Sequence, residues 1–363
     1  MAYAAITKPK LHFNIITYTG DGTSPKARTG VGFQPGLIWC KQRDEARSHQ
    51  WIDSVRGPDK TLQSNVGDAE GNQFSHGYLQ SIDSDGFTSV TGSSNTENWN
   101  KNSATYVAWN FKAGTSGSNS DGSISSTVSA NTTAGFSIVT YTGTGSVATV
   151  GHGLGAVPNL IIFKNRTDSG HSWDTYHHRT GTAYRFYLNE TVGKQSATNF
   201  INDTAPTSSV FTIGLAGHTN GSGDSHIAYC FAEKKGYSKF GNFKGNGNAN
   251  GSTIYTGFKP AWIMIKNQSS GSYKSFSIFD TTRQPSNLNV NKTLYANRNE
   301  PEGRRGDGST SSTIPAIDVL SNGFKCRVLN DEVNNSNDFV YIAFAEQPFV
   351  ANVGSNGVPT TAV

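Results

Sequence analysis

Charge and cysteine are both scarce in this sequence of 363 residues. Charged residues make up 15% of the chain and hydrophobic residues 34%, and both fractions are low for a globular protein. The three cysteines, Cys40, Cys230 and Cys326, are too few and too scattered for a disulfide framework, and none lies in a CxxC or zinc-binding spacing. Each stands in or beside an apolar run, so we expect buried free thiols.

Long apolar runs are also missing. No segment approaches the roughly 18 consecutive apolar residues that span a membrane, and the opening MAYAAITKPKLHF lacks the apolar core of a signal peptide. The formal net charge of +4 is spread along the chain and forms no basic stripe, which argues against nucleic-acid binding. We therefore expect a soluble protein that is made in a reducing cytosol, binds no nucleic acid and inserts into no membrane.

Glycine, serine, threonine and asparagine take the place of the missing charged and aliphatic residues. The 40 glycines favour tight turns, because glycine adopts positive φ angles easily. Aromatic residues, at 11%, argue against a disordered chain. This composition is typical of a turn-rich β protein whose small cores are anchored by aromatic side chains.

One block of sequence recurs three times, and in each copy a proline precedes a lysine by six residues. The blocks are GFQPGLIWCK (32–41), GLGAVPNLIIFK (153–164) and GFKPAWIMIK (257–266). Upstream lie FNIITYTGDG (13–22), FSIVTYTGTG (136–145) and the more degenerate FGNFKGNG (240–247). Downstream follow WIDSVR, WDTYHHR and FSIFDTTR, and the copies close on VAWNF, IAYCF and VYIAF. Ordered matches at three places identify an internal repeat.

The repeat sets the expected domain boundaries. The expected order is an N-terminal arm (1–12), repeat 1 (13–112), a Gly/Ser/Thr-rich linker or surface strap (113–134), repeat 2 (135–236), repeat 3 (237–349) and an extended C-terminal arm (350–363). Only KKGYS (234–238) separates repeats 2 and 3, so we expect those two to be closely coupled and repeat 1 to be tethered by the long linker.

The apolar centres of the three blocks are LIWC, LIIF and WIMI. Continuous apolar runs of this length, bounded by proline and lysine, are too short for helices and typical of strands buried on both faces. No window shows convincing helical periodicity. The expected fold class is therefore all-β, with three tandem β-sandwich (jelly-roll-like) domains of one repeated unit and little or no helix.

The repeat also carries three Lys/Arg pairs, which are Lys41/Arg56, Lys164/Arg179 and Lys266/Arg283. One interpretation is that they bind sulfate or acidic sugars. The favoured interpretation is structural, because a lysine at the end of a strand discourages edge pairing and an arginine beside Asp53 or Asp280 forms a local ion pair. Similarly, Trp51 and Trp173 are interpreted as packing residues and not as sugar-stacking platforms.

The sequence offers no clear catalytic or metal site. His171, His177 and His178 cluster in repeat 2, but neighbouring strand residues face opposite sides of a sheet, so we predict no metal there. Loops such as Asp21-Gly22 lack a calcium-binding spacing. There is no GxSxG motif, no repeated Ser/His/Asp set and no strand motif of paired carboxylates. We therefore predict no catalytic residue, no cofactor and no metal.

The repeated units nevertheless suggest a family. The pattern YTGDG, VGFQPGLIWCK, DSVRG, LQSN, SDGF and YVAW resembles a repeat of virion proteins of tailed bacteriophages, often described as tail-fibre or structural proteins and frequent in marine phages. MAYAAITKP and AFAEQPFV with GVPTTA resemble the two ends of such proteins. The resemblance implies a structural role on a virus particle and brings no catalytic motif or binding residue with it.

Three functions follow, in order of preference. The first is a non-enzymatic bacteriophage virion protein on the particle surface, in capsid decoration or in the tail or fibre. It would be made in the host bacterial cytoplasm, contact other virion proteins of the capsid or tail, and form a homo-oligomer on the particle. The second is a carbohydrate-binding, receptor-binding protein for host surface glycans, and the third is a glycan-degrading enzyme. The candidate ligand or assembly contacts are aromatic residues expected to be exposed outside the repeated positions: Trp99, Tyr78, Tyr184 and Tyr273.

Overall fold

The computed structural model describes residues 4–94, 98–269, 271, 274–285, 287, 292–303, 316–348, 350–353 and 356–359. Strands account for 43% and helices for 3%, so the chain is an all-β protein, as the sequence predicts. The helical segments of this part of the chain are α1 (Gly217–Asn220) and the single turns η1 (Pro9–Leu11) and η2 (Phe74–His76). None of them is long and apolar enough to cross a membrane.

Each repeat contains an antiparallel main sheet with the same strand order. In repeat 1 the order is β1 (Phe13–Thr19), β8 (Thr105–Phe111), β3 (Leu37–Gln42), β4 (Gln50–Asp53) and β5 (Gly57–Leu62). In repeat 2 it is β11 (Phe136–Thr142), β18 (Ser225–Phe231), β13 (Leu160–Asn165), β14 (Asp174–His177) and β15 (Tyr184–Tyr187), followed by β16 (Gln195–Ser196). In repeat 3 it is β19 (Ser238–Lys244), β26 (Asp338–Pro348), β21 (Phe258–Asn267), β22 (Ser277–Asp280) and β23 (Leu294–Tyr295). The repeat seen in the sequence is therefore a repeat of the fold, even where repeat 3 lacks the YTG signature.

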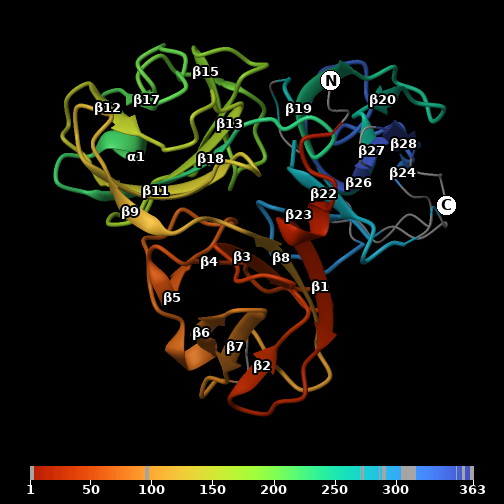
Figure 1. The fold of residues 1–363 in the computed structure, drawn as a ribbon, viewed down its shortest axis with the longest axis horizontal. Helices are drawn as coiled ribbons and strands as arrows, with labels where there is room; N and C mark the ends of the chain where they lie inside the picture. Colours follow the sequence, from red (N-terminus) through yellow and green to blue (C-terminus); the bar gives the residue numbers. More distant parts are fainter. Residues whose placement is uncertain are drawn as a thin grey trace. The chain divides into compact units, whose positions relative to one another are not determined.

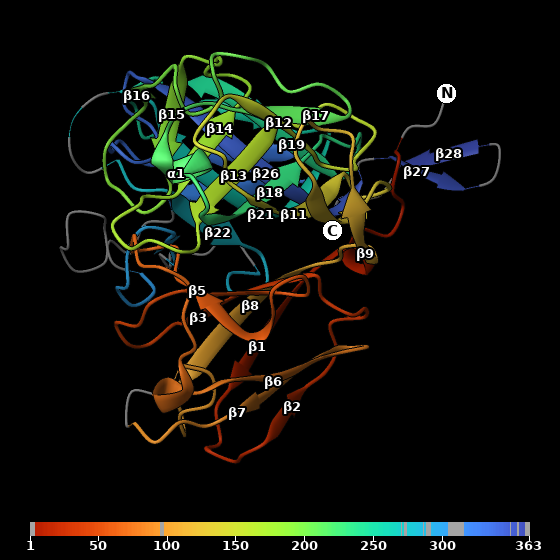
Figure 2. The ribbon, with the colours of Figure 1, turned by 90° about the vertical axis from the view of Figure 1, so that its left-hand side faces the viewer.

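A smaller antiparallel sheet forms the second layer of each repeat. These sheets are β2 (Lys26–Arg28), β7 (Gly86–Val90) and β6 (Tyr78–Asp83) in repeat 1, β12 (Ala148–Gly151) and β17 (Val210–Ile213) in repeat 2, and β20 (Thr253–Tyr255), β25 (Gly323–Cys326) and β24 (Ile317–Leu320) in repeat 3. Figure 2 shows the two layers of repeat 1, with β1, β3 and β8 in one and β2, β6 and β7 in the other. Each repeat is thus a two-layer sandwich.

The apolar block strands are buried on both faces, which confirms the prediction. All residues of β3 and of β13 are buried. Ile38 and Cys40 lie in the core between the two sheets of repeat 1, and Trp39 lies on the other face, 4.6 Å from Trp51 between ring centroids. The three cysteines are free and buried, also as predicted, and burial raises the pKa of the Cys40 thiol to about 12.

The segment predicted as a linker, residues 113–134, is instead part of the sheet of repeat 2. Its strands β9 (Ser116–Asn119) and β10 (Ser126–Asn131) pair with each other, and β10 pairs with β11 along six residues (Figure 1). Val128 of β10 is buried in the core of this repeat. The composition was misleading because small polar residues also occur in strands, and Ser126 and Ser129 are buried in β10 beside Val128.

The expectation that a long linker tethers repeat 1 is also wrong. Repeats 1 and 2 form one compact unit, made of Leu11–Asn189 and Ser196–Ala232. Repeat 3 belongs to the other unit, made of Met1–Lys10, Glu190–Gln195 and Glu233–Val363. The ring of Phe111 at the end of repeat 1 packs against Phe136 and Phe231 of repeat 2, at centroid distances of 5.5 and 5.7 Å. Packing of this kind, and not the length of the connecting segment, decides which repeats join.

The two expected arms are ordered in different ways. In the N-terminal arm Ala4 and Ile6 are buried, and Ala5 N donates to Lys235 O at 2.9 Å. The expected extended C-terminal arm contains a hairpin of β27 (Val350–Val353) and β28 (Asn356–Pro359).

Candidate functional site

The aromatic candidate contacts do not form one exposed surface. Trp99 was expected to be exposed, but its side chain is 0% exposed and lies in the core of repeat 1. Its carbonyl oxygen accepts a hydrogen bond from Tyr18 Oη at 3.0 Å, which fixes the backbone beside the core. Tyr78 is half-buried at the start of β6, and Tyr184 is 37% exposed at the start of β15. Tyr273 lies outside the described residues.

The three repeated lysines are buried, so they do not guard strand edges as the sequence suggested. Lys41, Lys164 and Lys266 are at most 1% exposed. Their amines donate to backbone carbonyl oxygens. Lys164 Nζ lies 2.8 Å from Asn165 O, and Lys266 Nζ lies 3.1 Å from Glu190 O.

Burial also lowers the pKa values of two of these amines. Burial lowers the pKa of Lys164 to about 8 and that of Lys266 to about 7. A backbone carbonyl offers only a partial charge, so it does not fully replace the water that a charged amine loses. Amines held in this way are not accessible to a sulfate or an acidic sugar in solvent. The three lysines therefore do not support the anion-binding interpretation.

Two of the three repeated arginines form the ion pairs that the sequence suggested. Arg56 Nε lies 2.5 Å from Asp53 Oδ2, and Arg283 Nε lies 2.6 Å from Asp280 Oδ2, with all four side chains almost fully buried. The third pair is different, because Arg179 is exposed. Only two repeats therefore hold such a pair.

Strand register explains why repeat 2 lacks the Asp–Arg ion pair of the other two repeats. Asp53 lies opposite the first residue of its block strand, and the residue at the same place in repeat 2 is His177. His177 Nδ1 accepts a hydrogen bond from Arg179 N at 3.2 Å, and its carbonyl oxygen accepts one from Thr180 Oγ1 at 2.7 Å. A histidine thus replaces the aspartate of this turn, and a threonine stands where the arginine would be.

Repeats 1 and 2 are joined by a buried cluster of charged groups. Arg56 Nη1 lies 3.1 Å from Glu70 Oε2, and Arg166 Nε of repeat 2 lies 2.9 Å from the same oxygen. Tyr229 Oη donates to Asp53 Oδ2 at 2.8 Å. Burial alone would raise the pKa of Glu70, but hydrogen bonds from Arg166 and the charge of Arg56 hold it below its usual value. The cluster is a structural junction whose charges are satisfied internally.

Aromatic rings complete this junction. The Trp51 ring lies 5.1 Å from that of Trp173 and 5.0 Å from that of Tyr229 between centroids. Trp173 Nε1 also donates to Gln63 O at 3.1 Å. Both tryptophans are at most 1% exposed, which confirms that they are packing residues.

A hydrogen-bonded serine–asparagine pair recurs in all three repeats and was not predicted from the sequence. The pairs are Ser48/Asn65, Ser172/Asn189 and Ser275/Asn297, with Nδ2 to Oγ distances of 3.1, 3.3 and 3.3 Å. The same asparagine accepts, through Oδ1, the N–H of the residue after the serine: His49, Trp173 or Phe276. Trp173 therefore corresponds to His49 and not to Trp51. The signal that would have revealed this is a serine before a ring, followed by Asn 17, 17 or 22 residues later.

A second repeated device is a buried asparagine that closes the glycine turn after the first strand. Asn100, Asn220 and Asn334 accept, through Oδ1, the N–H of Asp21, Thr144 and Asn246 at 3.0, 2.7 and 3.1 Å. The glycine before each of these N–H groups has no room for a side chain. A Cβ at Gly20, Gly143 or Gly245 would lie 2.1, 2.2 or 1.9 Å from the carbonyl oxygen of the residue after the asparagine.

The histidines of repeat 2 lie near carboxylates without forming a metal cage. The rings of His171 and His218 are 4.8 Å apart, and His218 Nδ1 lies 3.1 Å from Asp174 Oδ1. Arg185 Nη1 binds the other oxygen of Asp174 at 2.7 Å. His178 is half-buried beside His177, at 5.4 Å between centroids. No group of three or more His, Cys, Asp or Glu side chains suited to a metal occurs in the described part of the chain.

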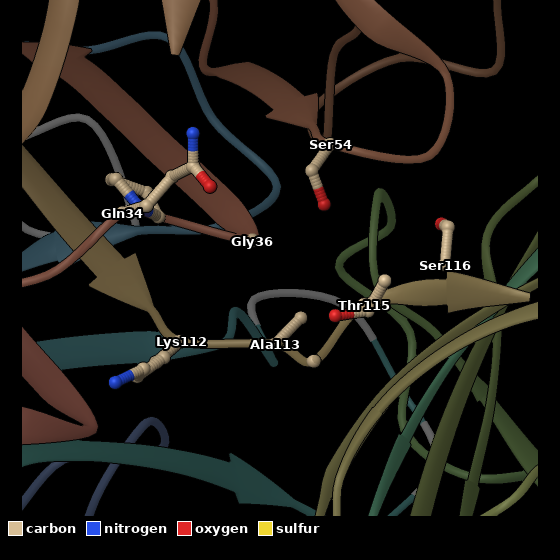
Figure 3. A pocket seen from close by; sticks show the side chains of 9 residues that line it. Gln34, Gly36, Ser54, Lys112, Ala113, Thr115 and Ser116 are labelled. Carbon is tan, nitrogen blue, oxygen red and sulfur yellow. The ribbon is translucent and has the colours of Figure 1, made fainter. Parts of the chain in front are cut away.

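One pocket of about 500 Å³ opens in the unit of repeats 1 and 2. It is lined by Gln34, Pro35, Gly36, Ser54, Lys112, Ala113, Gly114, Thr115 and Ser116. Figure 3 shows the hydroxyl groups of Ser54 and Thr115 directed toward the middle of the pocket, while the Lys112 side chain leads away from them. The lining contains neither a carboxylate nor an aromatic ring. It offers hydrogen bonds to a small polar molecule and no acid–base pair.

Comparison with known proteins gives a family but no activity. No curated protein matches the chain. The family model described as "Domain of unknown function (DUF7483)" matches residues 8–348, a range that includes all three repeats. The chain therefore belongs to the DUF7483 family, and the three repeats together correspond to one family unit.

Proposed function

We propose that this chain is a non-enzymatic structural protein on the surface of a bacteriophage particle, acting in capsid decoration or as a component of the tail or its fibres. The observation that carries the proposal is the use of the repeated polar residues. The buried lysines, the serine–asparagine pairs and the asparagine-closed turns all bond within the fold. A repeat whose polar side chains are used in this way supports a scaffold.

The junction of repeats 1 and 2 supports the same role. Asp53, Arg56, Glu70 and Arg166 satisfy each other across it, around the rings of Trp51 and Trp173. Breaking such a buried group of charges is unfavourable, because any charge left alone would have lost both its partner and its water. Two sandwiches held in this way form one compact unit, which suits a part that must keep its shape on a particle.

Detection in purified particles tests this proposal. We expect mass spectrometry of gradient-purified phage to find the chain as a constituent, and immunogold labelling with an antibody against it to mark the capsid or the tail. Presence in the infected-cell lysate together with absence from purified particles contradicts the proposal. Incubation of the protein with host polysaccharides should release no new reducing ends, and release would favour a glycan-degrading enzyme.

A host-attachment function is the second candidate, and one exposed aromatic pair favours it. Phe74 in η2 is 46% exposed, and its ring lies 4.7 Å from that of the half-buried Tyr78 in a T-shaped arrangement. Exposed rings of this kind present an apolar face on which a sugar ring packs. On a glycan array, Phe74→Ala should abolish any binding, while the control Tyr184→Ala on repeat 2 keeps it. Unchanged binding by Phe74→Ala, or no binding by the wild type, counts against this candidate.

A further inference from the structure

Among the described residues, repeat 2 is the only repeat in which a further strand pairs with the outer side of the first strand of the main sheet. There β10 pairs with β11 in the antiparallel sense, from Asn131 opposite Phe136 to Ser126 opposite Tyr141. In repeats 1 and 3 the main sheets end, within the described residues, at β1 and at β19. The chain therefore shows what fits this edge and also leaves the equivalent edge open elsewhere.

The backbone groups that face the open edge of repeat 1 follow from the register. Gly20 N, directly after β1, donates to Ala104 O on the β8 side at 2.8 Å. Successive residues of a strand direct their N–H and C=O groups to opposite sides, and β1 pairs with β8 without a bulge. Ile15, Thr17 and Thr19 therefore direct their backbone groups away from β8, toward the edge, where the N–H of Ile15 donates to Asn14 Oδ1 at 3.0 Å.

The side chains of β1 are less buried than their counterparts in β11, although the Arg28 guanidinium lies 4.1 Å from the centroid of the Tyr18 ring. Ile16 and Tyr18 pack against the core of repeat 1 but are only half-buried. Val139 and Tyr141, at the same positions of β11, are buried together with Val128 of β10. A strand added to β1 would cover Ile16 and Tyr18 in the same way.

The edges at β1 and β19 differ in their charged side chains. In β19 Lys239 pairs with Glu233 at 2.8 Å, Phe240 N donates to Glu233 Oε2 at 3.2 Å, and Lys244 is exposed. Charged side chains along an edge discourage the addition of another strand. The β1 sequence, FNIITYT, has no charge, so the edge of repeat 1 is the one suited to accept a partner.

The C-terminal hairpin provides a matching strand. Its strands β27 and β28 form a two-stranded sheet of their own. An isolated two-stranded hairpin is at best marginally stable in water, so it gains from joining a larger sheet. The sequences VANV and NGVP are uncharged and place valine among small residues, like the STVSAN of β10.

We propose that the C-terminal hairpin of a second copy of this chain adds to the free edge of β1, antiparallel, as β10 adds to β11. Such a contact joins two different surfaces, so it repeats from copy to copy and produces either a closed ring or a filament. It goes beyond the proposed function, because association between copies is independent of whether the protein lies on a phage particle.

Thr17→Pro tests this contact directly. The N–H of Thr17 faces the edge, so proline removes the hydrogen bond to an added strand and none of those to β8. The matched control is Asn242→Pro at the same position of β19, the charged edge. Sedimentation velocity at about 1 to 100 µM covers the range of moderate protein affinities.

We expect the wild type and Asn242→Pro to associate, and Thr17→Pro and a chain that ends at residue 349 to sediment as monomers. Circular dichroism should show that all four remain folded, with melting temperatures within about 4 °C of each other. A monomeric wild type overturns the proposal, and so does continued association of Thr17→Pro or of the shortened chain.

Hydrogen exchange of the wild type gives a second readout that requires no variant. The amides of Thr17 and Thr19 should become protected as the protein concentration rises, because an added strand accepts their hydrogen bonds. If their exchange is independent of concentration, the proposal is wrong even where Thr17→Pro fails to fold.

Discussion

The buried amine of Lys266 should make the stability of repeat 3 depend on pH in an unusual direction. Burial lowers its pKa from the ordinary 10.5 to about 7 in the folded protein. Between these two values the unfolded chain binds more protons than the folded one, so the free energy of unfolding rises with pH in this window. Lys266 contributes least to the free energy of unfolding below about pH 7, its pKa in the folded protein. There both states carry the proton, and the folded protein holds the charged amine away from water.

The size of the effect follows from the two pKa values. Between pH 6 and pH 9 the wild type should gain about 2.7 kcal/mol from this lysine, at about 1.36 kcal/mol for each unit of pH over which the unfolded state alone is protonated. Lys266→Met retains most of the apolar stem and removes the titrating amine, which lies over the Phe276 ring at 4.5 Å from its centroid. The difference in stability between wild type and variant should therefore change by about that amount between the two pH values.

Urea unfolding followed by tryptophan fluorescence at both pH values measures this difference. Lys244→Met, at an exposed lysine of the same repeat, is the control for the loss of one positive charge. Wild type and Lys266→Met that respond identically to pH would refute the reasoning, since they would show that this amine keeps its charge in the folded protein without penalty.

Two further substitutions test the glycine turn and the junction. Gly143→Ala should destabilise the protein by about 3 kcal/mol in urea unfolding, because the new Cβ would lie 2.2 Å from Gly221 O. The control Gly117→Ala should change the stability little, because its Cβ would meet nothing within 4 Å. Equal losses for the two variants would contradict the argument. Glu70→Gln should cost about 2 kcal/mol, because the fully buried Arg56 and the partly buried Arg166 lose the charge of their shared partner. A loss that disappears in high salt would show instead that the pairing is a surface effect.

The packing residues and the local ion pairs could be predicted from the sequence. Trp51 and Trp173 were interpreted as packing residues because an aromatic residue that recurs at one position of a repeat is usually buried. Both are buried, although the structure shows that Trp173 corresponds to His49 and not to Trp51. Arg56 and Arg283 were predicted to pair with an aspartate three residues earlier, which is a local contact. No such pair was predicted for Arg179, and in repeat 2 Thr180 stands at the position that the arginine has in the other two repeats.

Contacts between residues far apart in the chain could not be predicted. Trp99 follows a turn-rich segment and was expected to be exposed, but Tyr18, 81 residues away, binds its carbonyl oxygen beside the core. Lys164 was expected at an exposed strand end, but Gly67, 97 residues away, brings a carbonyl oxygen to its amine. Whether a side chain is exposed depends on what covers it, and the covering segment lies far away in the sequence, in the same repeat for Trp99 and in repeat 1 for Lys164.

The sequence by itself determined that this protein is all-β and built from one unit used three times. Short apolar runs between proline and lysine and abundant glycine leave few alternatives to strands and tight turns, and these are local preferences. Only the tertiary structure decided that residues 113–134 complete the sheet of repeat 2, that repeats 1 and 2 form one unit, and that the edge of β1 stays open. Each of these depends on which backbone groups find partners, and pairing between distant strands is set by packing and register, not by composition.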